Sequence, residues 1–67
     1  MILLKDFLKL YDNWNGYTVI KDKNLELYAR LKTVSLAENE DVNSRALNAE
    51  VLSFGFYDKE LTIRVNM

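Results

Sequence analysis

The sequence predicts an α+β fold in which a short N-terminal helix packs on a small antiparallel sheet of two hairpins, with a short helical connection between them. Three features indicate this class. Apolar residues recur with helical spacing near the N-terminus, a run of β-forming residues follows Gly16, and residues 49–67 hold two apolar stretches around a short polar turn. A chain of 67 residues has the length of one small domain, so we expect a single domain over 1–67.

Residues 3–11 are predicted to form an amphipathic helix. Its apolar side chains occupy the i, i+3, i+4 and i+7 positions of one stripe, namely Leu4, Phe7, Leu8 and Tyr11. A helix of about nine residues is not stable alone in water, so this stripe must dock on another element. The segment 12–16 then ends the helix, because Asn and Gly tolerate the backbone conformations of helix ends and turns.

Residues 17–20 are all β-formers and predict a strand, which a turn at residues 22–24 follows. Residues 25–32 fit two alternatives. As a helix they match three positions of the apolar template, but Lys32 occupies the fourth. As a strand after a turn with Asn24 in the left-handed conformation, they leave one apolar face that includes Leu25 and Leu31. We favour this hairpin, whose expected pairs are Val19 with Leu27 and Tyr17 with Ala29.

Residues 33–48 carry weaker signals. Ser35 and Glu38 have the spacing of a capping box, and an acidic run follows at residues 38–41. Residues 41–48 are compatible with one further short helical segment. We therefore expect a connection that contains a little helix and is exposed on its acidic side.

The C-terminal segment carries the strongest strand signal. A two-residue connection at Asp58-Lys59 places apolar residues opposite one another on one face: Phe56 with Leu61, Phe54 with Ile63, and Leu52 with Val65. The other face pairs Tyr57 with Glu60, Gly55 with Thr62, Ser53 with Arg64, and Val51 with Asn66. A slip of one residue would mix the two faces, so the loop must have an even length. Two or four residues satisfy this condition, and Asp-Lys is not a favoured two-residue turn. A glycine inside a strand, here Gly55, often marks a bulge or a close approach of another backbone.

The predicted core lies between the helix stripe and the apolar face of this hairpin. That face consists of Leu52, Phe54, Phe56, Leu61, Ile63 and Val65. Full burial of a large apolar side chain stabilises a fold by about 1.5–3 kcal/mol. We therefore expect these six residues and the helix stripe to form the core together.

Composition argues against catalysis and against metal binding. The chain has no Cys and no His, which removes the most common general base, the thiolate nucleophile and the most common transition-metal ligands. Its only glycines are Gly16 and Gly55, so it has no glycine-rich phosphate loop. We predict a non-enzymatic protein without a cofactor. No stretch reaches the roughly 18 apolar residues of a membrane span, and we expect a cytoplasmic location.

Protein binding is the function that the composition favours. Apolar residues make up 49% of a chain that lacks disulfides and metal sites, and small chains often gain stability by association, so we expect self-association. Trp14 stands in a polar loop, while Tyr57 and Arg64 lie on the hairpin face opposite the predicted core. Trp, Tyr and Arg are enriched at interface hot spots, and these three residues are our candidate partner-binding residues.

An accessory role in nucleic-acid binding is the alternative. Four basic residues crowd the first hairpin, with Tyr17 and Tyr28 nearby: Lys21, Lys23, Arg30 and Lys32. Basic groups between aromatic side chains are typical of single-strand binders. The net charge of −1 and the neighbouring Asp22 and Glu26 argue for an ordinary mixed-charge surface instead.

Two segments resemble small uncharacterised proteins of phages and mobile elements in Gram-positive bacteria. They are Leu8-Lys9-Leu10-Tyr11-Asp12-Asn13-Trp14-Asn15-Gly16 and Glu50-Val51-Leu52-Ser53-Phe54-Gly55-Phe56-Tyr57-Asp58-Lys59-Glu60-Leu61-Thr62-Ile63-Arg64-Val65. The likeness covers about the first and last quarters of the chain. It implies an N-terminal helix with a C-terminal hairpin, and an accessory protein that binds a host protein, such as a defence nuclease, in the host cytoplasm. It assigns no functional residue.

Overall fold

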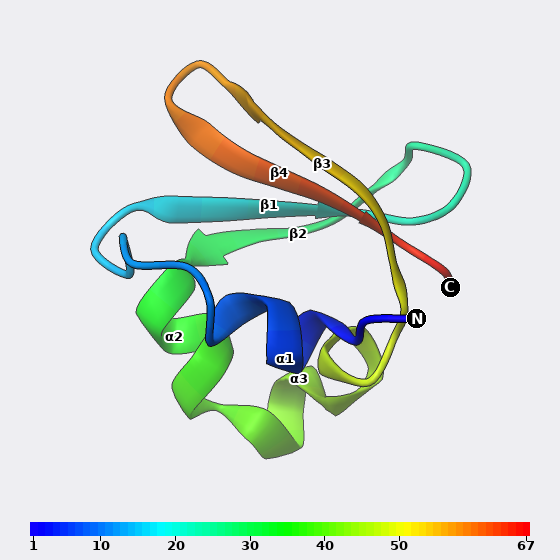
Figure 1. Ribbon diagram of the computed structural model, residues 1–67, viewed down its shortest axis with the longest axis horizontal. Helices are drawn as coiled ribbons and strands as arrows, with labels where there is room; N and C mark the ends of the chain where they lie inside the picture. Colours follow the sequence, from blue (N-terminus) through cyan, green and yellow to red (C-terminus); the bar gives the residue numbers. More distant parts are fainter.

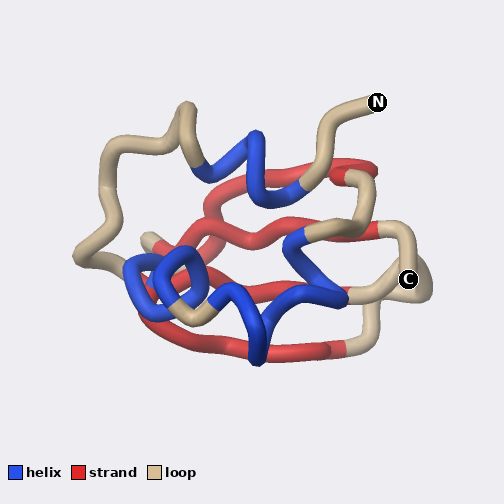
Figure 2. Tube along the Cα trace, turned by 90° about the horizontal axis from the view of Figure 1, so that it is seen from below, coloured by secondary structure: helices blue, strands red, loops and turns tan.

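Three helices cover one face of a four-stranded sheet (Figures 1 and 2). The computed structural model describes all 67 residues. In chain order the elements are α1 (Leu4–Leu8), β1 (Tyr17–Lys21), β2 (Leu27–Lys32), α2 (Thr33–Glu38), α3 (Glu40–Leu47), β3 (Val51–Tyr57) and β4 (Glu60–Val65). The predicted α+β class and its two antiparallel hairpins are confirmed.

The two hairpins join through a parallel pair of strands. The spatial order is β2-β1-β4-β3, and β1 runs parallel to β4. The sheet is therefore mixed rather than wholly antiparallel. This follows from the two-helix connection between β2 and β3, which carries the chain back across the sheet so that β4 enters beside β1 in the same direction. The edge strands are β2 and β3.

Helix α1 is shorter than the predicted 3–11. It spans five residues, and the chain then tightens into turns in which the N–H groups of Leu10 and Tyr11 donate to the carbonyls three residues earlier. The apolar stripe still docks on the rest of the protein as predicted. Leu4 and Leu8 are fully buried, and Phe7 and Tyr11 pack beside the core.

The strand alternative for residues 25–32 is confirmed from Leu27 onward, but the predicted register of the first hairpin is wrong. Val19 pairs with Arg30 and Tyr17 with Lys32, three residues beyond the expected partners. The cause is a longer turn over residues 22–26. The Asp22 carboxylate accepts bonds from the N–H groups of Asn24 and Glu26. Leu25, not Asn24, takes the left-handed conformation, with φ of 67°. Leu25 and Leu27 consequently lie in solvent rather than on an apolar face.

Residues 33–48 form two helices. The capping-box prediction is wrong, because α2 begins at Thr33 and Ser35 and Glu38 lie inside it. The short helix expected over residues 41–48 is confirmed as α3. Asn39 links the two helices, and both its backbone and side-chain N–H groups donate to the Ser35 carbonyl. Both helices contribute to the core, which the sequence did not indicate: Leu36, Ala46 and Leu47 are buried.

The C-terminal hairpin follows the predicted register over most of its length. The predicted even loop length is confirmed, and of the two lengths left open the structure has the two-residue turn at Asp58-Lys59. Both residues have positive φ, as a type I′ turn requires. The pairs from Tyr57–Glu60 to Ser53–Arg64 are those expected. The last two predicted pairs are wrong, because a bulge at Leu52 brings Val51 opposite Val65. The expectation for Gly55 is wrong, because Gly55 pairs regularly with Thr62 and the bulge lies at Leu52. The group nearest to Gly55 is a side chain of its own strand, since an added Cβ would lie 3.1 Å from the Tyr57 ring.

The core occupies the space between the helices and the central strands. Its apolar members are Leu4, Leu8, Ile20, Leu36, Ala46, Leu47, Ala49, Leu61, Ile63 and Val65. Two buried hydroxyls complete it, with Thr18 Oγ1 and Thr33 Oγ1 2.6 Å apart and Thr33 Oγ1 donating to the Gly16 carbonyl. Every buried side-chain polar atom has a partner.

The predicted burial of Leu52, Phe54 and Phe56 is wrong. Phe54 and Phe56 are each 59% exposed, and Leu52 is also exposed. The register does turn both phenylalanines to the helix side of the sheet, but little covers them there. A helix of five residues is about 8 Å long, whereas a seven-residue strand is about 23 Å long. Helix α1 therefore cannot cover β3, and as an edge strand β3 has only one neighbour.

Candidate interaction surface

Four aromatic side chains meet along the junction of α1 and β3. The Phe7 and Phe54 rings have centroids 4.9 Å apart and planes tilted by 56°, and the Tyr11 and Phe56 rings have centroids 6.1 Å apart. We call Phe7, Tyr11, Phe54 and Phe56 the aromatic surface. The two residues of α1 and its following turn are half-buried, and they support the two phenylalanines of β3 from one side.

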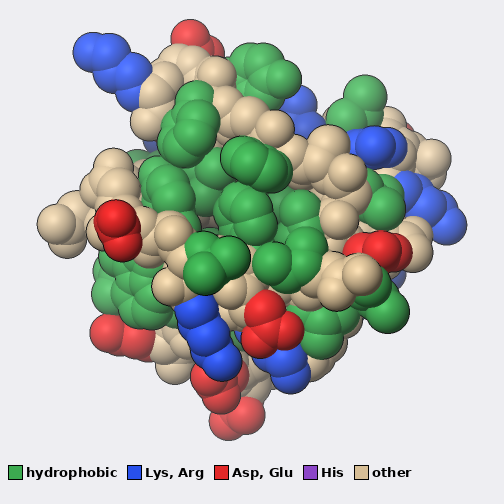
Figure 3. Space-filling view, in the orientation of Figure 1, with side chains coloured by type: hydrophobic (Ala, Val, Ile, Leu, Met, Phe, Trp, Pro, Cys, Tyr) green, Lys and Arg blue, Asp and Glu red, His purple; other side chains and the backbone are tan.

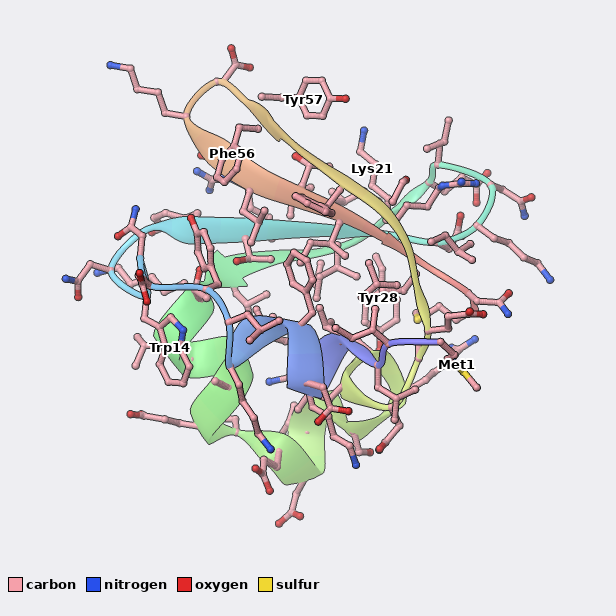
Figure 4. The ribbon with its side chains drawn as sticks, in the orientation of Figure 1. Met1, Trp14, Lys21, Tyr28, Phe56 and Tyr57 are labelled. Carbon is pink, nitrogen blue, oxygen red and sulfur yellow. The ribbon has the colours of Figure 1, made fainter.

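The outer sides of the two phenylalanine rings face solvent. Figure 3 shows hydrophobic side chains gathered across the middle of the face on which α1 and β3 lie. Phe56 is labelled in Figure 4, on β3 near the tip of the last hairpin. Exposed apolar clusters of this kind typically mark contact sites for other molecules.

The backbone of β3 adds a second feature to this surface. β3 ends the sheet, so one side of the strand has no neighbouring strand. Only its start is covered, because Val51 N–H donates to the Ile2 carbonyl and Leu3 forms a bridge with Glu50. From Leu52 to Tyr57 the outer side is uncovered, and we call this segment the free edge. Residues 51–57 include no charged side chain.

The sheet face opposite the helices is polar and uncovered. Arg30 on β2 reaches across the sheet and forms a two-point ion pair with Glu60 on β4, through Nε–Oε1 at 2.8 Å and Nη2–Oε2 at 2.5 Å. The same guanidinium lies 4.2 Å from the centre of the Tyr17 ring. Hydrogen bonding to Arg30 holds the pKa of Glu60 below its ordinary value. The Arg30 guanidinium therefore already has two partners within the protein, the Glu60 carboxylate and the Tyr17 ring.

The three predicted partner-binding residues do not form one site. Trp14 is half-buried, and its Nε1 donates to the Leu8 carbonyl at 3.2 Å, so it closes the end of α1. Tyr57 and Arg64 lie together on the polar sheet face and line a shallow hollow of about 340 Å³. Arg64 donates there to Ser53 Oγ and to the Lys23 carbonyl. Figure 4 shows Trp14 well separated from Tyr57.

Only some of the basic residues proposed for nucleic-acid binding lie together on one face of the sheet. Lys21 and Lys32 lie on the polar sheet face with Arg30, because Lys21 pairs with Arg64 and Lys32 with Tyr17, while Lys23 lies in the turn. Tyr28 is separated from them, because its ring lies near Arg45 of α3 at 6.0 Å.

Phe54 and Phe56 are the site residues that sequence reasoning assigned to the core instead. Their helix-side position followed from the pattern, but their exposure depends on the length of α1 and on the order of the strands. The only sequence signal for an open contact was the lack of charge over residues 51–57. No group of three or more acidic side chains is close enough to hold a metal ion, and none of the helices has the length and apolar character to cross a membrane.

Comparisons with known proteins add no relative. No family model, curated protein or solved structure matches the chain.

Proposed function

We propose that this chain is a small non-enzymatic protein-interaction module that binds its partners, including copies of itself, through the aromatic surface and the free edge of β3. The observation that carries the proposal is the exposure of Phe54 and Phe56 directly beside an unpaired strand edge. Aromatic side chains at interfaces supply large contact area, and an open strand edge supplies backbone hydrogen bonds. Both occur here on the same strand.

The resemblance to phage and mobile-element proteins supports a partner from the host cell. A phage-encoded protein of this kind would bind and modulate a host defence protein in the host cytoplasm. A strand edge suits such a role, because it pairs with any extended segment of suitable register and leaves selectivity to the flanking side chains.

Substitution of the two exposed phenylalanines tests this function. The double variant Phe54→Thr/Phe56→Thr keeps residues that favour strands but removes the aromatic contact area. We expect immobilised wild-type protein to retain a host protein from a Gram-positive cell lysate. The double variant should bind that host protein at least about tenfold more weakly, which corresponds to about 1.4 kcal/mol of binding free energy. Leu27→Thr is the matched control, because Leu27 is an exposed apolar residue on the other edge strand. Equal retention by wild type and double variant would contradict the proposal.

One observation favours the nucleic-acid alternative as a second candidate. Lys21, Lys32 and Arg64 share the polar sheet face with the exposed rings of Tyr17 and Tyr57. Titration of labelled single- and double-stranded oligonucleotides at two salt concentrations tests it. Salt-sensitive binding that Lys21→Glu/Lys23→Glu abolishes would support this candidate. Absence of binding at low salt would exclude it.

A further inference from the structure

We infer that a second copy of this chain pairs with the free edge of β3, antiparallel and about a two-fold axis at Gly55, so that the two sheets become one of eight strands. This inference rests on the proposed function and names the partner at that surface. It follows from the direction of the backbone groups of β3, from the contrast between the two sheet edges, and from the composition of the free edge.

The turn determines which backbone groups of β3 point outward. Tyr57 and Glu60 flank the two-residue turn and form its hydrogen-bonding pair. Such pairs alternate along an antiparallel ladder, so Gly55 and Ser53 also direct their N–H and C=O groups toward β4. Phe54 and Phe56 therefore direct theirs away from the sheet. The bond from Val51 N–H to the Ile2 carbonyl covers the strand before this point, so an added strand must be short and centred near Gly55.

The two edges of the sheet are protected very differently. β2 carries Arg30 and Lys32 and contains an irregularity opposite Ile20 and Lys21. Charges and bulges are the usual devices by which proteins prevent edge-to-edge pairing. Beyond its bulge at Leu52, the free edge has neither a charge nor a proline. β2 thus combines charged side chains with an irregularity, whereas β3 has only the bulge at its start, and this contrast indicates that the rest of β3 is the edge that pairs.

The free edge is complementary to itself. In antiparallel pairing about Gly55, Phe54 of one copy lies opposite Phe56 of the other on the helix side, and Ser53 lies opposite Tyr57 on the polar side. No charged group meets a like charge, because residues 51–57 have none. Aromatic cross-strand pairs are among the favourable ones in sheets. Gly55 at the centre leaves each Tyr57 ring in its place over its own strand.

The contact area indicates a weak, reversible dimer. Phe54, Phe56 and Tyr57 are 59%, 59% and 67% exposed. With about 200 Å² for each aromatic side chain, they offer roughly 350 Å² per copy. A standard stable interface buries about 800 Å² per partner. We therefore expect a dissociation constant in the range of micromolar or weaker.

Sedimentation equilibrium tests the inference. The protein concentration is varied from about 10 μM to about 1 mM, which brackets the expected dissociation constant. We expect the mass to rise reversibly from the monomer toward the dimer. Phe54→Lys should weaken association at least about tenfold, because it places a charge in the apolar contact. The milder Phe54→Thr should weaken it less and keeps the test valid if the lysine variant does not fold. Leu27→Lys, on the other edge, is the matched control and should associate like the wild type.

A charge-complementary pair of variants tests the register. Phe54→Lys and Phe56→Glu chains should each remain monomeric but associate several-fold more strongly when mixed, because the introduced positive charge of one chain would lie opposite the introduced negative charge of the other. No gain on mixing would overturn the Gly55-centred register. A wild-type monomer at every concentration, or a dimer that only Leu27→Lys disrupts, would overturn pairing through β3. Dependence of host-protein capture on Phe54 and Phe56 would in either case leave the proposed function standing.

Discussion

At the scale of single residues, each buried side-chain polar atom has a hydrogen-bond partner, and these partners explain the local geometry. Thr33 Oγ1 donates to the Gly16 carbonyl, so the hydroxyl of Thr18 must be the donor in the 2.6 Å contact between the two threonines. This pair ties the loop before β1 to the start of α2. Trp14 acts similarly at the end of α1, because its N–H group satisfies the Leu8 carbonyl.

The threonine pair predicts that the two substitutions to valine destabilise the protein to different extents. Thr33→Val should lower the free energy of unfolding by about 1–3 kcal/mol, because it leaves the buried Thr18 hydroxyl without an acceptor. Thr18→Val should cost less, about 1 kcal/mol or below, because Thr33 keeps its bond to Gly16. Urea denaturation of the two variants measures the difference. A larger loss in Thr18→Val than in Thr33→Val would contradict the assigned donor direction.

At the scale of elements, the last hairpin could be predicted in most of its detail and the first could not. Segregation of apolar and polar faces determines the register of β3 and β4, because a slip of one residue mixes them. The first hairpin has no such constraint. Its edge strand exposes Leu27, and its turn depends on side-chain bonds from Asp22 that strand propensity does not report. The register there follows the turn instead of the apolar pattern.

The turn of the last hairpin offers a second prediction. Asp58 and Lys59 have φ of 52° and 67°, which Asn and Gly adopt with less strain. Asp58→Asn/Lys59→Gly should raise the free energy of unfolding by about 1 kcal/mol. Thermal and urea unfolding measure the gain. Because the turn lies outside the free edge, the concentration dependence of sedimentation should not change. A double variant that is less stable than the wild type would contradict the turn conformation.

At the scale of the whole molecule, the proposed function depends on which side chains the helices leave uncovered. The sequence pattern identifies the apolar face of β3 and β4, but it does not tell how much helix lies above that face. α2 and α3 fill the core with Leu36, Ala46 and Leu47, and α1 is too short to reach over the edge strand. Phe54 and Phe56 therefore have the pattern of core residues and the exposure of interface residues. The exclusion of catalytic side chains, by contrast, rested on composition alone.

The same arrangement explains why the candidate site combines elements from both ends of the chain. Phe7 and Tyr11 come from the N-terminal helix and its turn, and the phenylalanines come from β3. Ile2 covers the first part of the strand and so limits the free edge to its second part. The chain thus leaves one short segment open for pairing.

Amide hydrogen exchange followed by NMR at increasing protein concentration tests the central claim most directly, because it reports on single backbone groups of the wild-type chain. In dilute solution the Gly55 and Tyr57 amides should exchange slowly, whereas those of Phe54 and Phe56 should exchange rapidly. As the concentration rises, exchange at Phe54 and Phe56 should slow, and exchange at Leu27 should not change. Slow exchange at Phe54 and Phe56 in dilute solution, or rapid exchange there at every concentration, would contradict a free edge that pairs with a second copy.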